Sequence, residues 1–281
     1  MFSHEQIARY YDLSQSQYEW AWQLKKSRAL HYGWWDDSTR NFHEALENNN
    51  RQLSRMAAIT AADTVLDAGC GIGGSSLWLA RNAGCRVTGI SLSEKQLVQA
   101  RHFAAAEGFT DQISFTRADF CATGFTDASF DVVWAQESVC HANDKNEFVR
   151  EAYRLLKPGG RLILADFFQQ PGLTGADAAL MQQWAHGWAC DHFSETGAFT
   201  EMLITHGFTV KEIFDATDAI RPSALRLYRT YWPGLLAGKL YNLFHPRATR
   251  QGMQNISTTR LQYLTLQKGL WKYFAVLAVK P

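Results

Sequence analysis

Between residues 63 and 168, short apolar runs alternate with longer stretches that have the apolar spacing of helices. The runs, such as TVLDAGC, RVTGIS and FDVVWAQ, are typical of strands buried on both faces. A strand–helix alternation of this kind requires a parallel sheet that is covered by helices on both sides. Two later strands, FTVKEIFDAT and WKYFAVLAVK, bring the expected number to seven. We therefore expect an α/β fold with a doubly wound, mostly parallel, seven-stranded sheet.

Local signals mark where several of these elements end or begin. Gly84 closes the first helical stretch, and the Ser93 hydroxyl is placed to cap the next helix. Pro158 and the two glycines after it end the amphipathic helix NEFVREAYRLL, before the strand RLILADFF.

The alternation lapses outside this region. Residues 1–60 have a helical pattern, and two irregular blocks follow Phe168, at about 169–196 and 219–267. The sheet core is expected in three stretches: 63–168, 197–218 and 269–281. From Ala219 onward the chain has ten Lys or Arg and no Asp or Glu. This basic segment fits a lid that grips an anionic head group, a peripheral membrane contact, or a solvated face.

Composition excludes several classes of protein. The 28 Lys and Arg balance 27 Asp and Glu, so the net charge of +1 gives no case for a nucleic-acid partner. No apolar stretch is long enough to span a membrane, and MFSHEQIARYYD has no apolar core of a signal peptide. Five cysteines without a CxxC pair indicate reduced thiols in a cytoplasm. No His, Asp or Glu set has metal-ligand spacing, so no metal is expected.

A glycine-rich loop, DAGCGIGGSS at 67–76, follows the first expected strand and opens a helix. Ligands of open α/β sheets bind at this edge, where glycines let the backbone approach them closely. The loop satisfies GxGxxG, but the acid that would hold a dinucleotide ribose is replaced by Ser91. Asp119, after the third strand, is instead placed to bind an adenine amino group.

With these pieces in order, the chain resembles the class I S-adenosylmethionine-dependent methyltransferases. The resemblance rests on DAGCGIGG, GISLSEKQ, RADF, FDVVWAQES and LKPGG, and covers residues 60–168 most strongly. Within that class the motifs are most similar to tocopherol and sterol C-methyltransferases, with kinship to isoprenoid-diphosphate and sarcosine or dimethylglycine methyltransferases. The resemblance implies a Rossmann-like methyltransferase domain at 61–281, with lid insertions, and a helical cap over the cofactor at 1–60.

The resemblance also implies which residues bind S-adenosylmethionine, whose product is S-adenosylhomocysteine. The methionine part would contact the glycine loop and the end of the fourth strand: Asp67, Gly69, Cys70, Gly71 and Gln136. The ribose and adenine would contact residues after the second and third strands: Ser91, Leu92, Gln96, Ala118, Asp119 and Phe120. In the N-terminal segment, Tyr11 would lie against the cofactor, where an aromatic ring attracts a sulfonium.

The stretch WAQESVCHAND supplies the candidate catalytic residues, Glu137 and His141. Glu137 can act as a base or stabilise a carbocation, and an imidazole such as His141 accepts a proton near neutral pH. The structural alternative is that Glu137 caps the loop and His141 is a buried histidine with satisfied hydrogen bonds.

Seventeen of the 20 Tyr and Trp residues lie outside 63–168, in the segments expected to cover the crevice. Such rings suit a closed, mostly apolar chamber for the methyl acceptor. The candidate acceptor-binding residues are Tyr10, Trp34, Trp184, Trp188, His192, Arg226 and Tyr228. For individual members, docking of helices is the competing interpretation.

The favoured function is methyl transfer to an apolar small molecule, at carbon of an isoprenoid, a prenyl diphosphate included, or of a prenylated phenol. N- or O-methylation of a small amine, acid or phenol is the alternative. A nicotinamide oxidoreductase and a non-catalytic S-adenosylmethionine-binding module are more remote. Mg²⁺ is expected only with a diphosphate acceptor, and the sequence indicates no oligomeric state.

Overall fold

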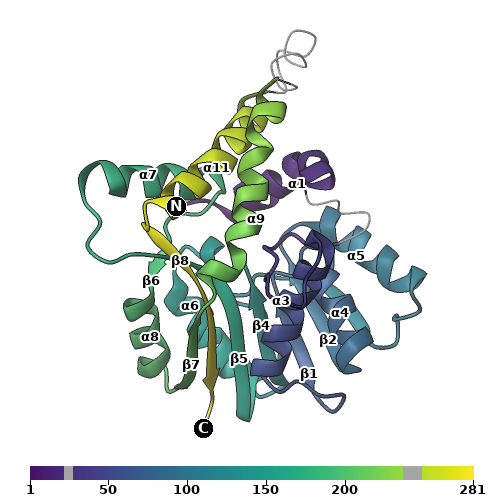
Figure 1. Cartoon of the computed structure of the whole chain (residues 1–281). Coiled ribbons are helices and arrows are strands. Elements are labelled where there is room, and N and C mark those ends of the chain that lie inside the picture. The colour runs from purple at the N-terminus through teal and green to yellow at the C-terminus, as the bar shows by residue number, and fades with distance from the viewer. Residues whose placement is uncertain (22–27, 237–248) are drawn as a thin grey trace.

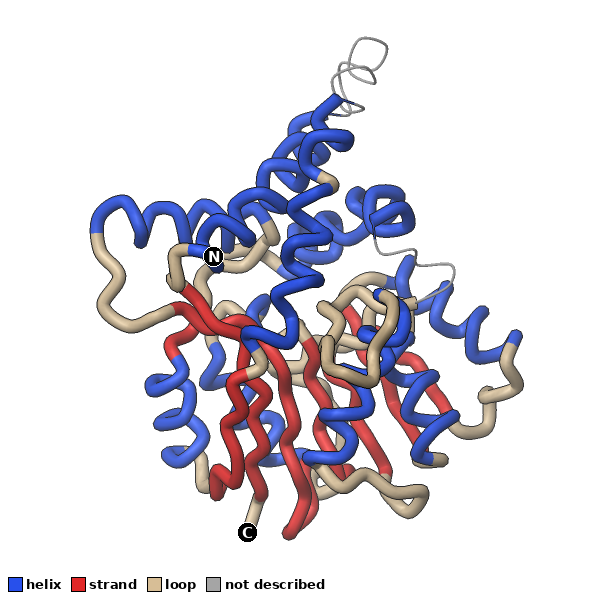
Figure 2. Tube along the Cα trace, viewed as in Figure 1, coloured by secondary structure: helices blue, strands red, loops and turns tan. Residues whose placement is uncertain are grey.

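The computed structural model describes residues 1–21, 28–236 and 249–281. The part of the second expected insertion at 237–248 therefore lies outside the described residues. Figure 2 shows a central sheet with helices on both faces and a group of further helices over one of its edges.

The sheet has the strand order β3-β2-β1-β4-β5-β8-β7. Its strands are β1 (Thr64–Ala68), β2 (Arg86–Ser91), β3 (Ile113–Arg117), β4 (Phe130–Gln136), β5 (Leu156–Gln169), β7 (Thr209–Asp215) and β8 (Trp271–Val279). The first five are parallel, whereas β8 runs antiparallel between β5 and β7. A two-residue strand, β6 (Ser194–Glu195), pairs with the end of β5. The expected doubly wound, mostly parallel α/β fold is confirmed.

Two apolar clusters, one on each face, hold the helices to the sheet. On one face the helices are α3 (Phe42–Met56), α4 (Gly74–Ala83) and α5 (Glu94–Ala106), and on the other α6 (Lys145–Leu155) and α8 (Thr196–Thr205). The central strands β1 and β4 are buried along nearly their whole length, as their apolar runs predict.

Two of the expected boundaries are confirmed and one differs. Ser93 caps α5 by accepting a hydrogen bond from the Gln96 N–H, and Gly84 ends α4 with a positive φ of 72°. The helix before Pro158 ends at Leu155, and Leu156–Gln169 forms one strand that includes LKPGG. A residue before proline disfavours the helical conformation, which explains the earlier helix end.

The remaining helices gather over the carboxyl edge of the parallel strands (Figure 1). They are α1 (His4–Ala21), α7 (Gly175–Gly187), α9 (Thr217–Arg229) and α11 (Thr249–Gln267). α11 contacts α1, α7 and α9, so the N-terminal segment and both irregular blocks form one layer. None of the described helices is both long and apolar enough to cross a membrane.

Candidate active site

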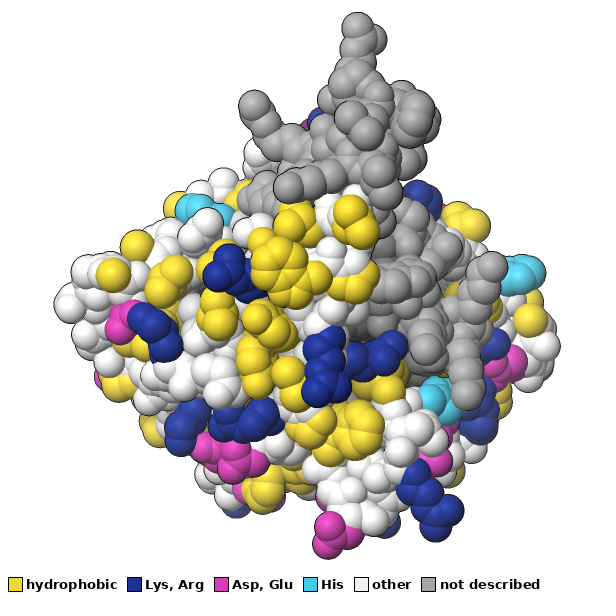
Figure 3. Space-filling model, turned by 45° about the horizontal axis from the view of Figure 1, so that its top comes forward, with side chains coloured by type: hydrophobic (Ala, Val, Ile, Leu, Met, Phe, Trp, Pro, Cys, Tyr) yellow, Lys and Arg dark blue, Asp and Glu magenta, His cyan; other side chains and the backbone are white. Residues whose placement is uncertain are grey.

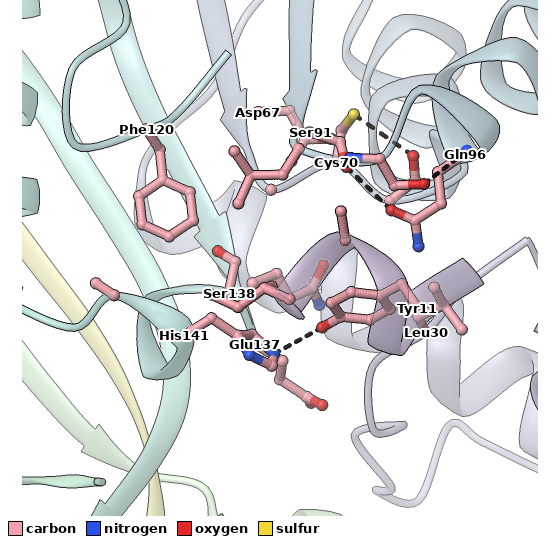
Figure 4. Close-up of a pocket in the computed structure, with 18 of the residues that line it drawn as sticks. Tyr11, Leu30, Asp67, Cys70, Ser91, Gln96, Phe120, Glu137, Ser138 and His141 are labelled. Atoms are coloured by element: carbon pink, nitrogen blue, oxygen red, sulfur yellow. Dashed lines mark hydrogen bonds between the residues drawn. The ribbon is translucent and has the colours of Figure 1, made fainter. Parts of the chain in front are cut away.

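A cleft of about 1150 Å³, open solvent at its mouth included, lies at the carboxyl ends of β1, β2 and β4. Its floor is the glycine loop after β1, and its roof comes from α1 and from the segment 28–31 (Figure 4). Thirteen of the fourteen predicted cofactor-binding and catalytic residues line it: Tyr11, Asp67, Gly69, Cys70, Gly71, Ser91, Leu92, Gln96, Asp119, Phe120, Gln136, Glu137 and His141. Ala118 is the exception and packs against an apolar cluster.

At Gly69 the glycine loop has no room for a side chain. Gly69 has a φ of +93°, and a Cβ on it would lie 2.4 Å from Cβ of Ser138. Close approach and the left-handed backbone therefore both require glycine here. Beneath the loop, Ser76 donates a hydrogen bond of 2.6 Å to the buried Asp67 carboxyl. Burial raises the pKa of Asp67 to about 6, because it disfavours the charged carboxylate. A positively charged ligand group beside the carboxylate would offset that cost.

The residues predicted for the ribose and the adenine lie along one wall. The Ser91 hydroxyl donates to Oε1 of Gln96 at 3.0 Å, so both side chains are held at the end of β2. Asp119 accepts from the Cys121 N–H through Oδ1, and its Oδ2 lies 3.2 Å from the His4 ring. Hydroxyl, amide and carboxylate groups thus stand where the predicted ribose and adenine would require hydrogen bonds.

Gln136 provides an independent indication that the cleft fits the methionine end of the predicted cofactor. Its Oε1 accepts a hydrogen bond of 2.8 Å from Ser75, but its Nε2 is buried and has no partner among the described residues. A buried donor without an acceptor is costly, and a ligand carboxylate would satisfy it. The unpaired amide, the buried Asp67 and the closely approached backbone at Gly69 fit S-adenosylmethionine.

Glu137 leaves the end of β4 in an unusual conformation, with a φ of +50°. Its Oε1 accepts two hydrogen bonds, from the Tyr32 N–H at 2.7 Å and from the Tyr273 hydroxyl at 2.8 Å. Burial raises the pKa of the Glu137 carboxyl to about 8, the Asp166 charge adds to this, and the two hydrogen bonds oppose it. The carboxyl can therefore exchange a proton close to neutral pH.

His141 ends a short 3₁₀ turn, Val139–His141, and faces Tyr11 across the cleft (Figure 4). Its Nε2 lies 2.6 Å from the Tyr11 hydroxyl, and its Nδ1 lies 3.4 Å from the Ala189 carbonyl. A carbonyl only accepts, so Nδ1 carries a proton, and Nε2 shares a hydrogen bond with the Tyr11 hydroxyl. Burial opposes a charged ring, but Cys140, Asp166 and the Ala189 carbonyl favour it, so the pKa of His141 is raised from its ordinary value.

Two thiols lie beside this histidine. The possible ligand atoms of Cys140, His141 and Cys190 are all within 4.8 Å of one another, a grouping that the sequence does not predict. Burial raises the pKa of the Cys140 thiol well above its ordinary value. Nδ1 of His141 lies 3.4 Å from the Cys190 sulfur and 3.4 Å from the Ala189 carbonyl oxygen.

None of the seven predicted acceptor-binding residues lines the cleft, and most pack against other rings. Trp184 is fully buried beside Phe193 and Trp271, and Trp188 contacts Tyr32 and Phe167. The others are placed as follows: Tyr10 against Tyr11, Trp34 stacked on Phe214, Arg226 over Phe42, Tyr228 against Tyr263, and His192 exposed beside Asp191. Trp34, Trp184 and Trp188 therefore belong to the apolar cluster that covers the α3–α4–α5 face of the sheet.

The charge of the cleft is predominantly negative. Five carboxyl groups line it: Asp67, Asp119, Glu137, Asp144 and Glu147. Arg28 is the only Lys or Arg among its described lining residues, and Arg28 pairs with Glu107. None of the described residues of the basic segment, 219–236 and 249–281, belongs to the lining. Instead, basic and apolar side chains lie side by side on the surface that Figure 3 turns forward, and Trp232 and Leu236 are exposed after α9.

Of three further polar side chains near the site, sequence reasoning missed two, Tyr273 and Asp166. Tyr273 lies in a strand whose apolar pattern indicates burial and nothing more. Asp166, buried in β5, accepts hydrogen bonds from the N–H groups of Cys140 and Phe167. His31 lines the cleft with a buried Nε2 that has no partner among the described residues, and burial lowers its pKa to about 4.

Comparison with known proteins identifies this architecture. Residues 66–164 match the family model described as a methyltransferase domain. The chain is 34% identical to methyltransferase GfsG of Streptomyces halstedii over 69% of its own length and 70% of the relative. It is 33% identical to 2-methyl-6-phytyl-1,4-hydroquinone methyltransferase of Synechocystis sp., over 82% of this chain and 72% of that one.

Solved structures share the fold along nearly the whole chain. The cyclase SpnF superposes with a TM-score of 0.81 at 20% identity, covering 100% of this chain and 97% of the other. Geranyl diphosphate methyltransferase in complex with GPP and sinefungin gives a TM-score of 0.80 at 18% identity, covering 99% of both. Together with the family match, these findings show that the chain belongs to the class I S-adenosylmethionine-dependent methyltransferases.

Proposed function

We propose that this enzyme methylates an uncharged, apolar small molecule at carbon, an isoprenoid or a prenylated phenol, and that Glu137 accepts the proton released. The observation that carries the proposal is the Glu137 carboxyl, held at the cleft by two hydrogen bonds to one oxygen. The relatives support the acceptor class, since one is named for a phytylated hydroquinone.

The negative charge of the cleft narrows the class of methyl acceptor that we propose. Without a metal ion a diphosphate requires several cationic side chains, and Arg28 is the only described Lys or Arg in the lining. Arg226, predicted to bind such a group, lies over the Phe42 ring instead. The proposal therefore includes no diphosphate and assigns no residues to Mg²⁺.

S-adenosylmethionine, when bound, supplies an electrophilic methyl group on a positively charged sulfur. In the proposal the glycine loop and Gln136 Nε2 bind its carboxylate, and Asp67 stabilises its ammonium group. Ser91 and Gln96 bind the ribose, Leu92 and Phe120 enclose the adenine, and Asp119 accepts from the adenine amino group. Tyr11 closes the cleft from above and excludes water.

Glu137 completes the reaction at carbon. When the new carbon–carbon bond has formed, the methylated carbon carries a proton that must leave to restore the double bond or the aromatic ring. The acceptor double bond would supply the electron pair of the new carbon–carbon bond, while the methyl–sulfur bond breaks and its pair stays on sulfur as S-adenosylhomocysteine. The electron pair of the carbon–hydrogen bond then returns to the acceptor, and the proton passes to the Glu137 carboxylate. A carboxyl with a pKa of about 8 retains that proton until product leaves.

Methylation of a hydroxyl or an amine is the second candidate, and the Tyr11–His141 pair favours it. His141 lines the cleft, and its imidazole can accept the proton of an acceptor O–H or N–H group through the Tyr11 hydroxyl that is hydrogen-bonded to Nε2. The carboxyl-rich lining also suits an acceptor that carries a positive charge.

The two candidates are separated by the position of a labelled methyl group. The enzyme is incubated with isotope-labelled S-adenosylmethionine and a panel of prenylated phenols, sterols, methylated glycines and prenyl diphosphates. Mass spectrometry counts the methyl groups, and NMR distinguishes methyl on carbon, oxygen and nitrogen. We expect methyl on carbon, with turnover lost in Glu137→Gln and retained in Glu212→Gln, an exposed carboxyl on β7. Methylation of amines only would overturn the proposal.

A further inference from the structure

We infer that Tyr273, in the last strand of the sheet, is a positioning residue that orients the Glu137 carboxyl so that Oε2 is the oxygen that exchanges the proton. The inference rests on the proposed role of Glu137 and extends it to a side chain outside the cleft. Tyr273 is fully buried and lies opposite Phe167 of β5 in the antiparallel pair β5–β8.

The direction of the Tyr273 hydroxyl is determined by its neighbours. The Asn49 amide Nδ2 donates to the Tyr32 carbonyl at 2.7 Å and to the Tyr273 oxygen at 3.3 Å. A carbonyl only accepts, so the orientation of the amide follows from the first bond. The Tyr273 oxygen thus accepts from Asn49 and must direct its own proton to Oε1 of Glu137, 2.8 Å away.

Because two donors occupy one oxygen of the Glu137 carboxyl, only the other oxygen is available to carry a proton. The Tyr32 N–H and the Tyr273 hydroxyl both donate to Oε1, so a proton on a neutral Glu137 can sit only on Oε2. Oε2 has no hydrogen-bond partner among the described residues. Hydrogen bonds to Oε1 therefore fix the orientation of the carboxyl, and Oε2 remains able to exchange a proton. This is what a positioning residue does for a general base.

The charged and polar groups around Glu137 are few. They are the Tyr32 N–H in the segment before α3, the Tyr273 hydroxyl in β8 and the Asp166 carboxylate in β5. Both hydrogen bonds favour the charged carboxylate, whereas Asp166 and burial disfavour it. Removing the Tyr273 hydroxyl therefore makes Glu137 harder to ionise, and activity that needs the carboxylate shifts to higher pH.

The test compares Tyr273→Phe with Tyr32→Phe. Each variant loses one buried tyrosine hydroxyl, but the Tyr32 hydroxyl donates to Oε1 of Gln262, and the Tyr32 N–H that holds Glu137 remains. In Tyr273→Phe we expect the acid limb of the kcat/KM profile to move up by about one pH unit, because a hydrogen bond to a charged group is lost. In Tyr32→Phe the limb stays in place. If the Tyr273 hydroxyl has only a structural role, Tyr273→Phe lowers Tm but its acid limb stays at the same pH as that of Tyr32→Phe. That result would overturn the inference.

A second readout does not depend on turnover. The carboxyl band of Glu137 is titrated by infrared difference spectroscopy, with Glu137→Gln as the blank. The pH midpoint of this titration should move to a higher value in Tyr273→Phe. If Glu137→Gln retains full activity while the midpoint still shifts, the proposed function fails and the positioning stands. If the midpoint does not shift, the positioning fails. Should Tyr273→Phe not fold, Asn49→Leu frees the same hydroxyl and should give a smaller shift in the same direction.

Discussion

The hydroxyl of Tyr11 lies 2.6 Å from Nε2 of His141, although the two residues are 130 positions apart in the chain. This hydrogen bond joins the N-terminal helix α1 to the turn after β4, directly across the cleft. The contact links the roof of the site to His141, the candidate base for methylation at oxygen or nitrogen.

Tyr11→Phe should lower kcat roughly 10-fold to 100-fold, since the His141 ring loses the group that holds it and the cleft becomes more open to water. Steady-state kinetics with the accepted substrate measures the effect. Tyr153→Phe is the control, because that ring packs on Phe208, away from the cleft. Equal kcat values for both variants would contradict a role of Tyr11 in turnover.

Asp67→Asn should weaken S-adenosylmethionine binding about tenfold or more, because the ligand loses a buried negative charge. The pKa of Asp67 is raised to about 6, so the carboxyl is protonated below that pH. Affinity of the native protein should therefore fall as pH drops through 6, while affinity of the variant stays flat. Calorimetric titration at several pH values measures both. Asp218→Asn, an exposed partner of Arg221, should behave like the native protein.

Gly69→Ala should abolish cofactor binding, because its Cβ would lie 2.4 Å from Cβ of Ser138 and its φ is +93°. Gly108→Ala is the matched control: φ there is +77°, and nothing lies within 4 Å of the added Cβ. Both variants carry backbone strain of the order of 1 kcal/mol. Cofactor affinity lost only in Gly69→Ala would assign the effect to the close approach of the loop to Ser138. Loss in both would assign it to strain.

The stability of the protein should depend on pH through Glu137. Its pKa is raised from 4.5 to about 8 on folding, so between these values the folded state binds more protons than the unfolded chain. The free energy of unfolding therefore falls as pH rises through this window, by up to a few kcal/mol. Glu137→Gln should lack this contribution. Compared with the native protein in urea unfolding, the variant should therefore be relatively more stable at pH 9 than at pH 5. An unchanged difference between native protein and variant would exclude a raised pKa.

The fold and the cofactor half of the site could be predicted because both depend on local patterns. Apolar runs and glycines specify strands, turns and the carboxyl edge of a parallel sheet, where Asp67, Asp119 and Gln136 necessarily meet. The predicted end of α6 lies further along the chain than the observed one. LKPGG was assigned to the end of the helix, whereas it belongs to the strand that follows.

The acceptor half could not be predicted in the same way. Helical spacing shows that Trp184 and Trp188 share an apolar face, but not whether that face meets a cleft or other rings. In the structure it meets Phe167, which comes from a different element. The partner of Glu137 was missed for the same reason. Alternation along β8 indicates that Tyr273 is buried, and only the sheet order places its hydroxyl beside a residue from β4.

Strand β8 lies between β5 and β7, yet it follows both of them in the chain. During synthesis β5 and β7 therefore emerge with their facing edges unpaired, and they stay so until β8 has left the ribosome. The strand that closes this gap also carries the hydroxyl that holds Glu137. A chain in which β8 is unpaired or out of register would therefore lack the Tyr273 hydroxyl at Glu137 as well as the closed sheet.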